Sequence, residues 1–308
     1  MRLRACRYPA SQPPDIQPQT MYRIFASIVH HPVSYQIGPL NATGFGLAML
    51  LAFVIGQIIA TNELERRGED AAPVGDMVFA AVIGGLLGAK LYYAVLMHDM
   101  ASLLSRAGFV FWGGLIGGIL AVVAVVIYKK LSVAKMSDAV ALALPAAYSI
   151  GRTGCWAVGD DYGRPFSGPW AVMFPEGAPP STVSNMSRMF GVSFPPGTSP
   201  FEVIAVHPTQ IYEVLMGLAM FLILWRFRDH KHAVGWLFGF YCLLAGIERF
   251  IVEFFRAKDD RFFVGGMTTA QVIAVGFALF GAAWMVMRRN VTPTAPGIYS
   301  KRPATGAG

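Results

Sequence analysis

The chain has 308 residues, of which 55% are hydrophobic and only 14% charged, with a mean hydropathy of +0.49. A soluble domain carries about 25% charged residues, so this composition excludes an ordinary soluble enzyme and a largely disordered chain, and predicts an integral membrane protein. The formal net charge of +7 is scattered over loops and forms no basic stripe, which argues against a nucleic-acid-binding protein.

The chain begins with a polar, proline-rich segment, residues 1–20, that lacks the apolar core of a signal peptide. We interpret it as a tail, or as an upstream extension with Met21 as the true initiator. Residues 1–36 are assigned to this tail and to an outer-surface segment. Residues 37–290 are assigned to one membrane domain, and residues 291–308 to a cytoplasmic tail.

Seven mostly apolar stretches follow, each close to the length of about 20 residues that a membrane helix requires. Their predicted bounds are 44–61, 74–96, 108–128, 138–154, 208–225, 233–254 and 267–287. The predicted fold class is therefore an all-α integral membrane protein with seven transmembrane helices. Glycines four residues apart predict close packing of the second and third helices, and the pairs are Gly84 and Gly88, Gly113 and Gly117, and Gly114 and Gly118.

Lysine and arginine are about three times denser in the loops 61–73, 128–137 and 226–232 and in the tail from residue 288 than in the other loops. By the positive-inside rule these segments are cytoplasmic, so the N-terminus lies outside and the C-terminus lies in the cytoplasm. The loop 155–206 is then extracytoplasmic. Because it is long and contains eight prolines and several aromatic residues, we expect it to be ordered and functional.

Charged side chains inside the predicted spans are costly in a bilayer and are therefore candidates for function. They are Lys90, Asp138, Arg152, Glu213, Glu248, Arg249 and Glu253. Asp138 begins the fourth span and is interpreted as an anchor for the N-terminus of that helix. Lys90 lies in the middle of its span, and its role stays open.

In and just after the sixth span, five residues spaced four and three apart predict one narrow face of a helix. They are Cys242, Gly246, Arg249, Glu253 and Arg256. Two interpretations stay open. One is a structural ladder of ion pairs, and the other is a cationic site for a phosphate, to which the planar guanidinium group can donate two parallel hydrogen bonds.

Arg152 ends the fourth span between Gly151 and Gly154, where another backbone or a ligand can come close. Arg152, Arg249 and Arg256 all lie toward the outer side, with few carboxylates expected beside them. An anionic lipid head group would supply the missing negative charge.

The fifth span opens with His207 and Pro208, and proline suits the first position of a helix. Gln210, Glu213 and Gly217 then share one helical face. His207 by itself, as a lone histidine at a helix start, is more often a capping or surface residue than a base. Glu213 is the stronger candidate because a carboxylate inside a span needs a partner.

The three cysteines, Cys6, Cys155 and Cys242, form neither a CxxC pair nor a zinc-binding spacing with histidine. We therefore expect no structural disulfide, no metal and no cofactor. The chain also lacks the internal repeat and the paired broken helices that are typical of many transporters.

Three stretches together resemble the prolipoprotein diacylglyceryl transferase family: GRTGCWAVGDDYG at 151–163, HPTQIYE at 207–213 and GIERFIVEFFR at 246–256. IGPL at 37–40 and FWGGLIGG at 111–118 add weaker support. The resemblance implies a protein of the bacterial cytoplasmic (inner) membrane that moves the diacylglyceryl group of phosphatidylglycerol onto the lipobox cysteine of prolipoproteins, with release of glycerol phosphate. The implied partners are phosphatidylglycerol, prolipoprotein signal peptides and membrane lipids, without nucleic acid.

The resemblance also implies roles for individual residues. Arg152 matches the family's phospholipid-binding arginine, and Arg249 matches its second essential arginine. The expected substrate-binding residues are Arg152, Asp160, Gly163, Gln210, Tyr212, Glu213, Glu253 and Arg256. Of these, Asp160 is expected to pair with an arginine, and Glu213 with Gln210 or an arginine.

The sequence departs from the family pattern at two positions. Many members have histidine where Trp112 stands and asparagine where Cys155 stands. Because that histidine has been proposed as the base that activates the thiol, we assign His207 as the catalytic base, the one outer group with an unperturbed pKa near the operating pH. Two alternatives stay open: an altered or inactive relative that binds lipid or lipoprotein, favoured by these departures, and, less strongly supported, a transporter.

Overall fold

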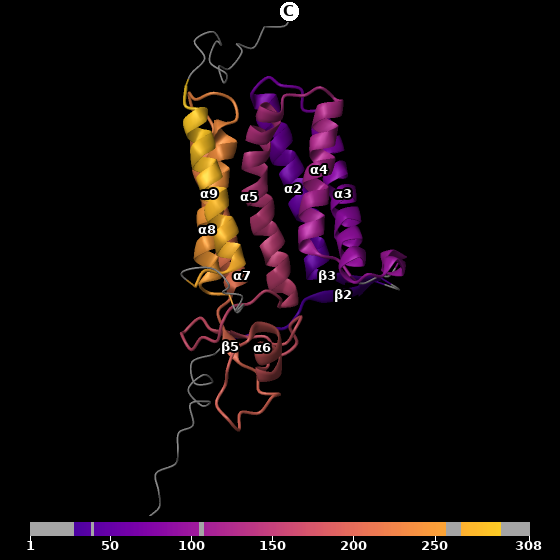
Figure 1. Ribbon diagram of the computed structural model, residues 1–308, viewed down its shortest axis with the longest axis vertical. Coiled ribbons are helices and arrows are strands. Elements are labelled where there is room, and N and C mark those ends of the chain that lie inside the picture. Colours follow the sequence, from indigo (N-terminus) through magenta and orange to yellow (C-terminus); the bar gives the residue numbers. More distant parts are fainter. Residues whose placement is uncertain (1–27, 38–39, 105–107, 257–265, 291–308) are drawn as a thin grey trace, which may run out of the picture.

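The computed structural model describes residues 28–37, 40–104, 108–256 and 266–290. Cys6, Met21, the tail 291–308 and the middle of the IGPL motif, Gly38 and Pro39, lie outside the described residues. The long helices run side by side and carry a smaller head at one end (Figure 1). Their bounds are α2 Gly44–Arg66, α3 Pro73–Leu96, α4 Phe111–Tyr128, α5 Val133–Val158, α7 Thr209–Phe227, α8 Trp236–Glu253 and α9 Thr269–Met287.

Each long helix coincides with one of the seven predicted stretches, and the described chain is mostly helical. Five of these helices, α2, α3, α4, α7 and α9, are long and apolar enough to cross a membrane by length and composition. The fourth stretch, predicted as 138–154, extends further in both directions and forms a helix of 26 residues, the longest in the described part of the chain. The side chain of Ser132 caps its start by accepting a hydrogen bond from Lys135, and Gly159 ends it with a left-handed backbone, φ 69°.

Glycines allow α3 and α4 to pack with their backbones nearly in contact, as the spacing predicts. A Cβ atom on Gly88 would clash with the carbonyl oxygen of Gly113, and one on Gly117 would clash with that of Gly84. The two helices lie beside each other in Figure 1. Since neighbouring apolar side chains gain little from leaving lipid, such close backbone contact is a main source of helix association in a bilayer.

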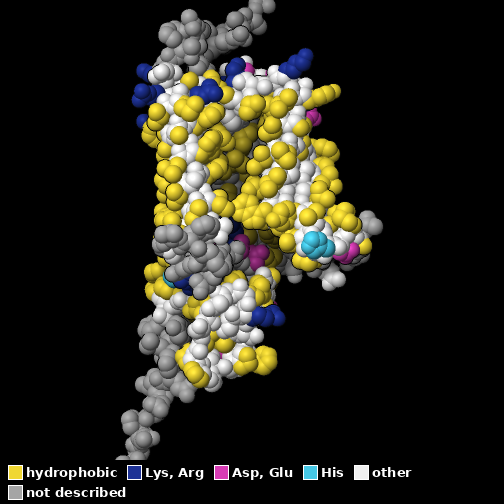
Figure 2. Space-filling model, in the orientation of Figure 1, with side chains coloured by type: hydrophobic (Ala, Val, Ile, Leu, Met, Phe, Trp, Pro, Cys, Tyr) yellow, Lys and Arg dark blue, Asp and Glu magenta, His cyan; other side chains and the backbone are white. Residues whose placement is uncertain are grey.

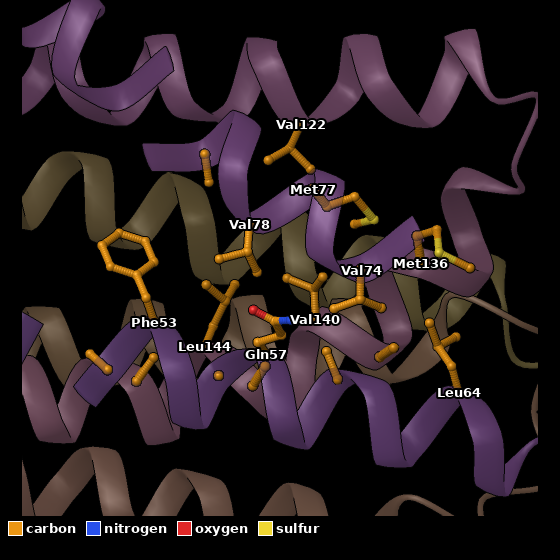
Figure 3. Close-up of a pocket in the computed structure, with 17 residues that line it drawn as sticks. Phe53, Gln57, Leu64, Val74, Met77, Val78, Val122, Met136, Val140 and Leu144 are labelled. Carbon is orange, nitrogen blue, oxygen red and sulfur yellow. The ribbon is translucent and has the colours of Figure 1, made fainter. Parts of the chain in front are cut away.

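An apolar cavity of about 200 Å³ lies among α2, α3, α4 and α5 (Figure 3). Among the described residues that line it, Gln57 is the polar one, and its side chain points toward the space in the close-up. Figure 2 shows the molecule hollowed on one face between the helix pair α8–α9 and the pair α3–α4, with acidic side chains where this hollow meets the head.

Asp138 does not anchor its own helix as the sequence analysis expects. Its carboxylate is fully buried and caps the start of α8 from the side: Oδ2 accepts a hydrogen bond from the backbone N–H of Gly235 at 2.8 Å, and Oδ1 accepts one from Phe238 at 3.0 Å. Arg67 lies 3.7 Å from the same carboxylate. Because α8 begins at a glycine without a capping side chain, Asp138 supplies the acceptor that this helix start lacks.

Replacing Asp138 with alanine is expected to lower the free energy of unfolding by about 2–4 kcal/mol, because two buried N–H groups lose their acceptor and Arg67 loses a buried counter-charge. Denaturant unfolding in detergent micelles measures this. Asp76→Ala is the matched control, since its exposed carboxylate pairs with Lys129 and should contribute less than about 1 kcal/mol. Equal small losses in both variants would contradict the capping role.

The loop 155–206 is ordered, as predicted, and forms most of the head. It contains α6, Val183–Phe190, and two short strands, β4 Val172–Met173 and β5 Ala205–Val206. Strand β1, Ile28–Val29, pairs in parallel with β4, which pairs antiparallel with β5. The head therefore adds strands that an all-α class omits.

The head has its own apolar core, built from seven buried side chains. They are Tyr162, Val172, Phe174, Val183, Met186, Ile204 and Val206. A hairpin of β2, Ser34–Ile37, and β3, Leu40–Thr43, leads from the head into α2. These contacts fix the position of the head against one end of the helix bundle, where α5 enters it and α7 leaves it.

Lys90, whose role the sequence leaves open, lies near the short helix η1, Met100–Leu104, that follows α3. Its Nζ atom donates a hydrogen bond to the carbonyl oxygen of Ser102 at 3.5 Å and sits 4.6 Å from the ring centroid of Phe109. This side chain therefore ties α3 to the connection between α3 and α4.

Candidate active site

Three arginines converge on one buried carboxylate at the end of the bundle that carries the head. Arg152 lies near the end of α5, Arg249 lies in α8, and Arg256 follows that helix. Their Nη atoms lie 3.1, 3.8 and 3.7 Å, respectively, from Oε1 of Glu213, a fully buried residue of α7. The structure thus brings together the arginines and the glutamate that the sequence analysis singled out.

Asp161 bridges two of these arginines, and the sequence analysis missed it. One carboxylate oxygen lies 2.7 Å from Nη1 of Arg152, and the other lies 2.7 Å from Nη2 of Arg256. Asp161 has a left-handed backbone, φ 55°, which aspartate tolerates better than most residues. Its carbonyl oxygen accepts a hydrogen bond from Thr209 Oγ1, so the turn after α5 is held against the start of α7.

Arg249 has a second carboxylate partner. Its Nη2 atom donates to Oε2 of Glu253 at 2.6 Å, one helical turn further along α8. Oε1 of Glu253 accepts a hydrogen bond from Thr268, whose side chain also caps the start of α9. Glu253 therefore connects the arginine cluster to α9, as the interpretation of an ion-pair ladder requires at this position.

Tyr148 lies between two glutamates on neighbouring helices. Its hydroxyl oxygen is 3.1 Å from Oε1 of Glu213 and 3.3 Å from Oε1 of Glu248. Together with Asp161 and Glu253, these glutamates surround the arginines with negative charge. The expectation of arginines with few carboxylates nearby is therefore wrong.

Asp160 does not form the arginine pair that the sequence analysis expects, because the neighbouring Asp161 takes that place. The contact that holds Asp160 runs through its backbone: Nε2 of Gln210 donates to the Asp160 carbonyl oxygen. Burial raises the pKa of the Asp160 carboxyl to about 6, and the charge of Asp161 acts in the same direction.

The pKa of Asp161 is shifted the other way. Burial alone would raise the pKa of this carboxyl, but the charges of Arg256 and Arg152 outweigh it and hold the pKa far below its ordinary value. Asp160 therefore gains and loses a proton near pH 6, whereas Asp161 stays ionised at any physiological pH.

His207 lies among aromatic side chains. Its ring stacks on Phe166 at a centroid distance of 3.9 Å and meets Phe255 edge-on at 5.3 Å. Its Nδ1 atom lies 3.0 Å from the hydroxyl of Tyr212, which accepts a hydrogen bond from the indole N–H of Trp170 at 2.7 Å. Burial lowers the pKa of His207. Among the described contacts, none joins this ring to the arginine cluster.

Gly163 joins the head to the membrane helices. Its N–H donates to the carbonyl oxygen of His207 at 2.8 Å, and its backbone pairs with that of Arg256 in a single antiparallel β-bridge. A Cβ atom here would clash with the carbonyl oxygen of Phe255. Glycine at 163 therefore allows the close approach that places Arg256 beside Asp161.

The two departures from the family pattern lie in different surroundings. Trp112 is in the first turn of α4, 45% exposed, with its ring against Phe111 at 5.8 Å. Cys155 is buried in the cluster, with Sγ 3.6 Å from Nη1 of Arg152.

Cys155, Asp160 and Asp161 could in principle share a cation, since one ligand atom of each lies within 4.8 Å of the others. Arg152 and Arg256 already bind Asp161, however, and their charges oppose a metal ion at this position. The arrangement is better suited to an anion.

Comparison with protein families distinguishes the transferase interpretation from the transporter interpretation. Residues 32–287 match the family described as prolipoprotein diacylglyceryl transferase. This chain belongs to the prolipoprotein diacylglyceryl transferase family. The match covers all seven long helices, the head except for strand β1, and every residue of the arginine cluster.

Individual relatives agree with the family match. Proteins named phosphatidylglycerol–prolipoprotein diacylglyceryl transferase from Geobacter sulfurreducens and Rhodospirillum rubrum are 31% and 32% identical to this chain, over 85% and 86% of its length. The one from Stenotrophomonas maltophilia is 29% identical over 90%. These alignments cover 97%, 95% and 97% of the relatives. As a member of the transferase family with five apolar helices of spanning length, the chain is a multi-pass membrane protein.

Proposed function

We propose that the arginine cluster binds the phosphate of phosphatidylglycerol while the lipobox cysteine of a prolipoprotein attacks the adjoining glycerol carbon. The chain transfers the diacylglyceryl group of phosphatidylglycerol to prolipoproteins, the reaction after which its relatives are named. The observation that carries the proposal is the exposed bridge that Asp161 makes between Arg152 and Arg256. Neither the altered-relative interpretation nor the transporter interpretation gains support from the comparisons.

The bridge supports a phosphate site because of its geometry. Two guanidinium groups present N–H donors to two oxygens of one anion, which is also how they would bind the two free oxygens of a phosphodiester. The Asp161 side chain is 40% exposed, against 16% for Arg152 and 8% for Arg256. A lipid phosphate arriving from the surface can therefore replace the carboxylate of Asp161. Arg249, 29% exposed, is close enough to add a third donor.

The chemical step is a displacement at carbon. A sulfur–carbon bond forms between the cysteine thiolate and the terminal glycerol carbon of the diacylglyceryl group, and the bond from that carbon to the phosphate oxygen breaks. Glycerol phosphate leaves with the electron pair. Charge grows on the leaving phosphate, and fixed guanidinium donors stabilise it without reorganising at the moment of reaction.

We propose that Asp160 is the general base that accepts the proton of the attacking thiol. A general base works best with a pKa near the operating pH, and the raised pKa of about 6 brings this carboxyl close to it. The residue also adjoins Asp161, where the phosphate is proposed to bind. His207, assigned from the sequence, remains the competing candidate, and its ring faces Tyr212 and Phe166.

The proposed topology has seven spans, with the N-terminus and the head outside the cytoplasmic (inner) membrane of a bacterium. Lysine and arginine side chains gather at the bundle end opposite the head in Figure 2, and the positive-inside rule makes that end cytoplasmic. α5 and α8 fall outside the five apolar helices, and both carry charged residues of the cluster. The head would then receive the lipobox segment of a translocated prolipoprotein.

A cysteine at Ser184 in the head is expected to react with a membrane-impermeant maleimide in intact cells, whereas one at Ser132 between α4 and α5 is not. Both positions are exposed, so access alone does not separate them. A Cys6→Ser background removes the native cysteine outside the described residues. Labelling at Ser132 but not at Ser184 would invert the topology and move the arginine site to the cytoplasmic side.

The activity itself is tested with purified protein, phosphatidylglycerol labelled in its acyl chains and a peptide that carries a lipobox. The expected result is a labelled peptide whose mass has risen by one diacylglyceryl group. A peptide with serine in place of the cysteine is the matched control and should stay unlabelled. An unlabelled cysteine peptide with folded protein would contradict the proposed function.

A further inference from the structure

Two buried side chains of α7 carry oxygen atoms for which the described residues provide no hydrogen-bond partner. They are Oε1 of Gln210 and Oε2 of Glu213, and both residues have 0% exposure. Three residues apart, they lie on the same face of the helix. A buried acceptor without a partner is unusual in a folded protein and needs an explanation, such as a ligand that supplies the missing donor.

The surroundings fix the direction in which these oxygens point. The amide nitrogen of Gln210 is committed to the Asp160 carbonyl oxygen, so its oxygen must face away from that contact. Oε1 of Glu213 accepts a hydrogen bond from the Tyr148 hydroxyl and faces the arginines, so Oε2 is the oxygen that lacks a partner. Nε of Arg152 is a third polar atom with no partner in the described part of the chain.

A ligand that satisfies this arrangement must combine two chemical properties. Arg152 and Arg256 can bind an anionic group in place of the Asp161 carboxylate, and the free acceptors require hydrogen-bond donors. An amine could pair with Glu213, but three guanidinium groups lie within 3.8 Å of the same carboxylate and repel a second cation. Neutral hydroxyl groups on a phosphodiester satisfy both requirements.

We propose that Gln210 and Glu213 accept hydrogen bonds from the terminal glycerol hydroxyls of phosphatidylglycerol and so determine which head group the enzyme uses. This inference rests on the proposed function, whose phosphate site it extends by a subsite for the leaving group. Bound hydroxyls would hold the departing glycerol phosphate at both ends. That placement keeps the breaking carbon–oxygen bond in line with the attacking thiolate.

The wild-type protein tests the proposal through two lipids of equal charge. Phosphatidylethanol has the same phosphodiester as phosphatidylglycerol but no hydroxyl on its head group. With purified full-length protein in detergent micelles, we expect phosphatidylglycerol to bind at least about tenfold more tightly, since a site built for a hydroxyl rejects the analogue that lacks it. Equal affinities would overturn the proposal and leave these oxygens to be satisfied by water.

Glu213→Gln provides the sharper test. The arginines favour the amide oxygen at the position of Oε1, so an NH2 group replaces the unpartnered oxygen and a donor stands where an acceptor stood. This variant is expected to bind phosphatidylglycerol at most about threefold more tightly than phosphatidylethanol. Gln210→Met, which removes an acceptor at similar volume, should lower the same preference. Arg188→Gln, at an exposed site on α6, should keep the wild-type preference.

The outcomes separate this inference from the proposed function. A variant that weakens both lipids equally would overturn the proposal, because the residue would then serve only the phosphate or the fold. Selective binding without transfer to the peptide would support the subsite and count against the transferase. Transfer to the peptide without selective lipid binding would support the transferase and overturn the subsite. Thermal unfolding of each variant checks that the protein is folded, and the wild-type comparison needs no variant.

Discussion

Arg152→Ala and Arg249→Ala are each expected to lose about 2–4 kcal/mol of transition-state stabilisation, which lowers the rate of transfer roughly 30- to 1,000-fold. Each removes a charge-assisted donor to the leaving phosphate. Initial rates of labelled-lipid transfer at saturating peptide measure the effect. Lysine at either position should rescue poorly, because an ammonium group cannot donate the two parallel hydrogen bonds of a guanidinium.

A structural role for the arginines predicts a different pattern. Removing Arg152 takes a close partner from the buried Glu213 carboxylate, so part of its effect reflects stability. Arg249 is more exposed, but it pairs with the buried Glu253 at 2.6 Å, so thermal unfolding must show that its alanine variant is folded. The folded Arg249→Ala protein is expected to lose transfer. Arg188→Ala on the head is the matched control and should keep its rate. Near-wild-type transfer by Arg249→Ala would favour the ion-pair ladder over the phosphate site.

Asp160→Asn is expected to lower transfer by a factor of about 10²–10⁴, the usual range for loss of a general base. The base acts in its deprotonated form, so the wild-type rate should fall as the pH drops through about 6 and level off above it. The asparagine variant should lose this dependence. Rates from pH 5 to pH 8 at saturating lipid measure both effects.

His207→Gln is the comparison that decides between the two candidate bases. With Asp160 as the base, this variant should lose less than about tenfold in rate and keep the fall below pH 6. A role for His207 requires the opposite: the pH dependence would vanish in His207→Gln and persist in Asp160→Asn. In that case Tyr212, which contacts the ring, would be its positioning residue.

The sequence predicts the helices well because each carries its own signal. About 20 apolar residues identify a membrane helix without reference to its neighbours, and glycines four apart identify the close contact between α3 and α4. The arginine face of α8 is also local, since 3.6 residues per turn align Arg249 and Glu253. These features depend on residues within one segment of chain.

Features that depend on distant partners could not be predicted in the same way. Asp138 caps a helix that begins almost 100 residues later, and its position near the start of α5 suggested a local role. Asp161 and Asp160 are adjacent, and which of them meets the arginines is decided by the left-handed backbone at Asp161. The strands of the head are only two residues long, too short to leave a periodic pattern.

In the proposed mechanism the arginines hold a phosphate that leaves with glycerol when sulfur bonds to carbon. Quantifying every product of one reaction with a lipobox peptide tests it most directly. We expect one glycerol phosphate to be released for each thioether-linked diacylglyceryl group on the peptide, and both products to fall together with Arg152→Ala. Modified peptide accompanied by free glycerol, or by acyl esters without glycerol phosphate, would show that a different bond breaks and would contradict the proposed mechanism.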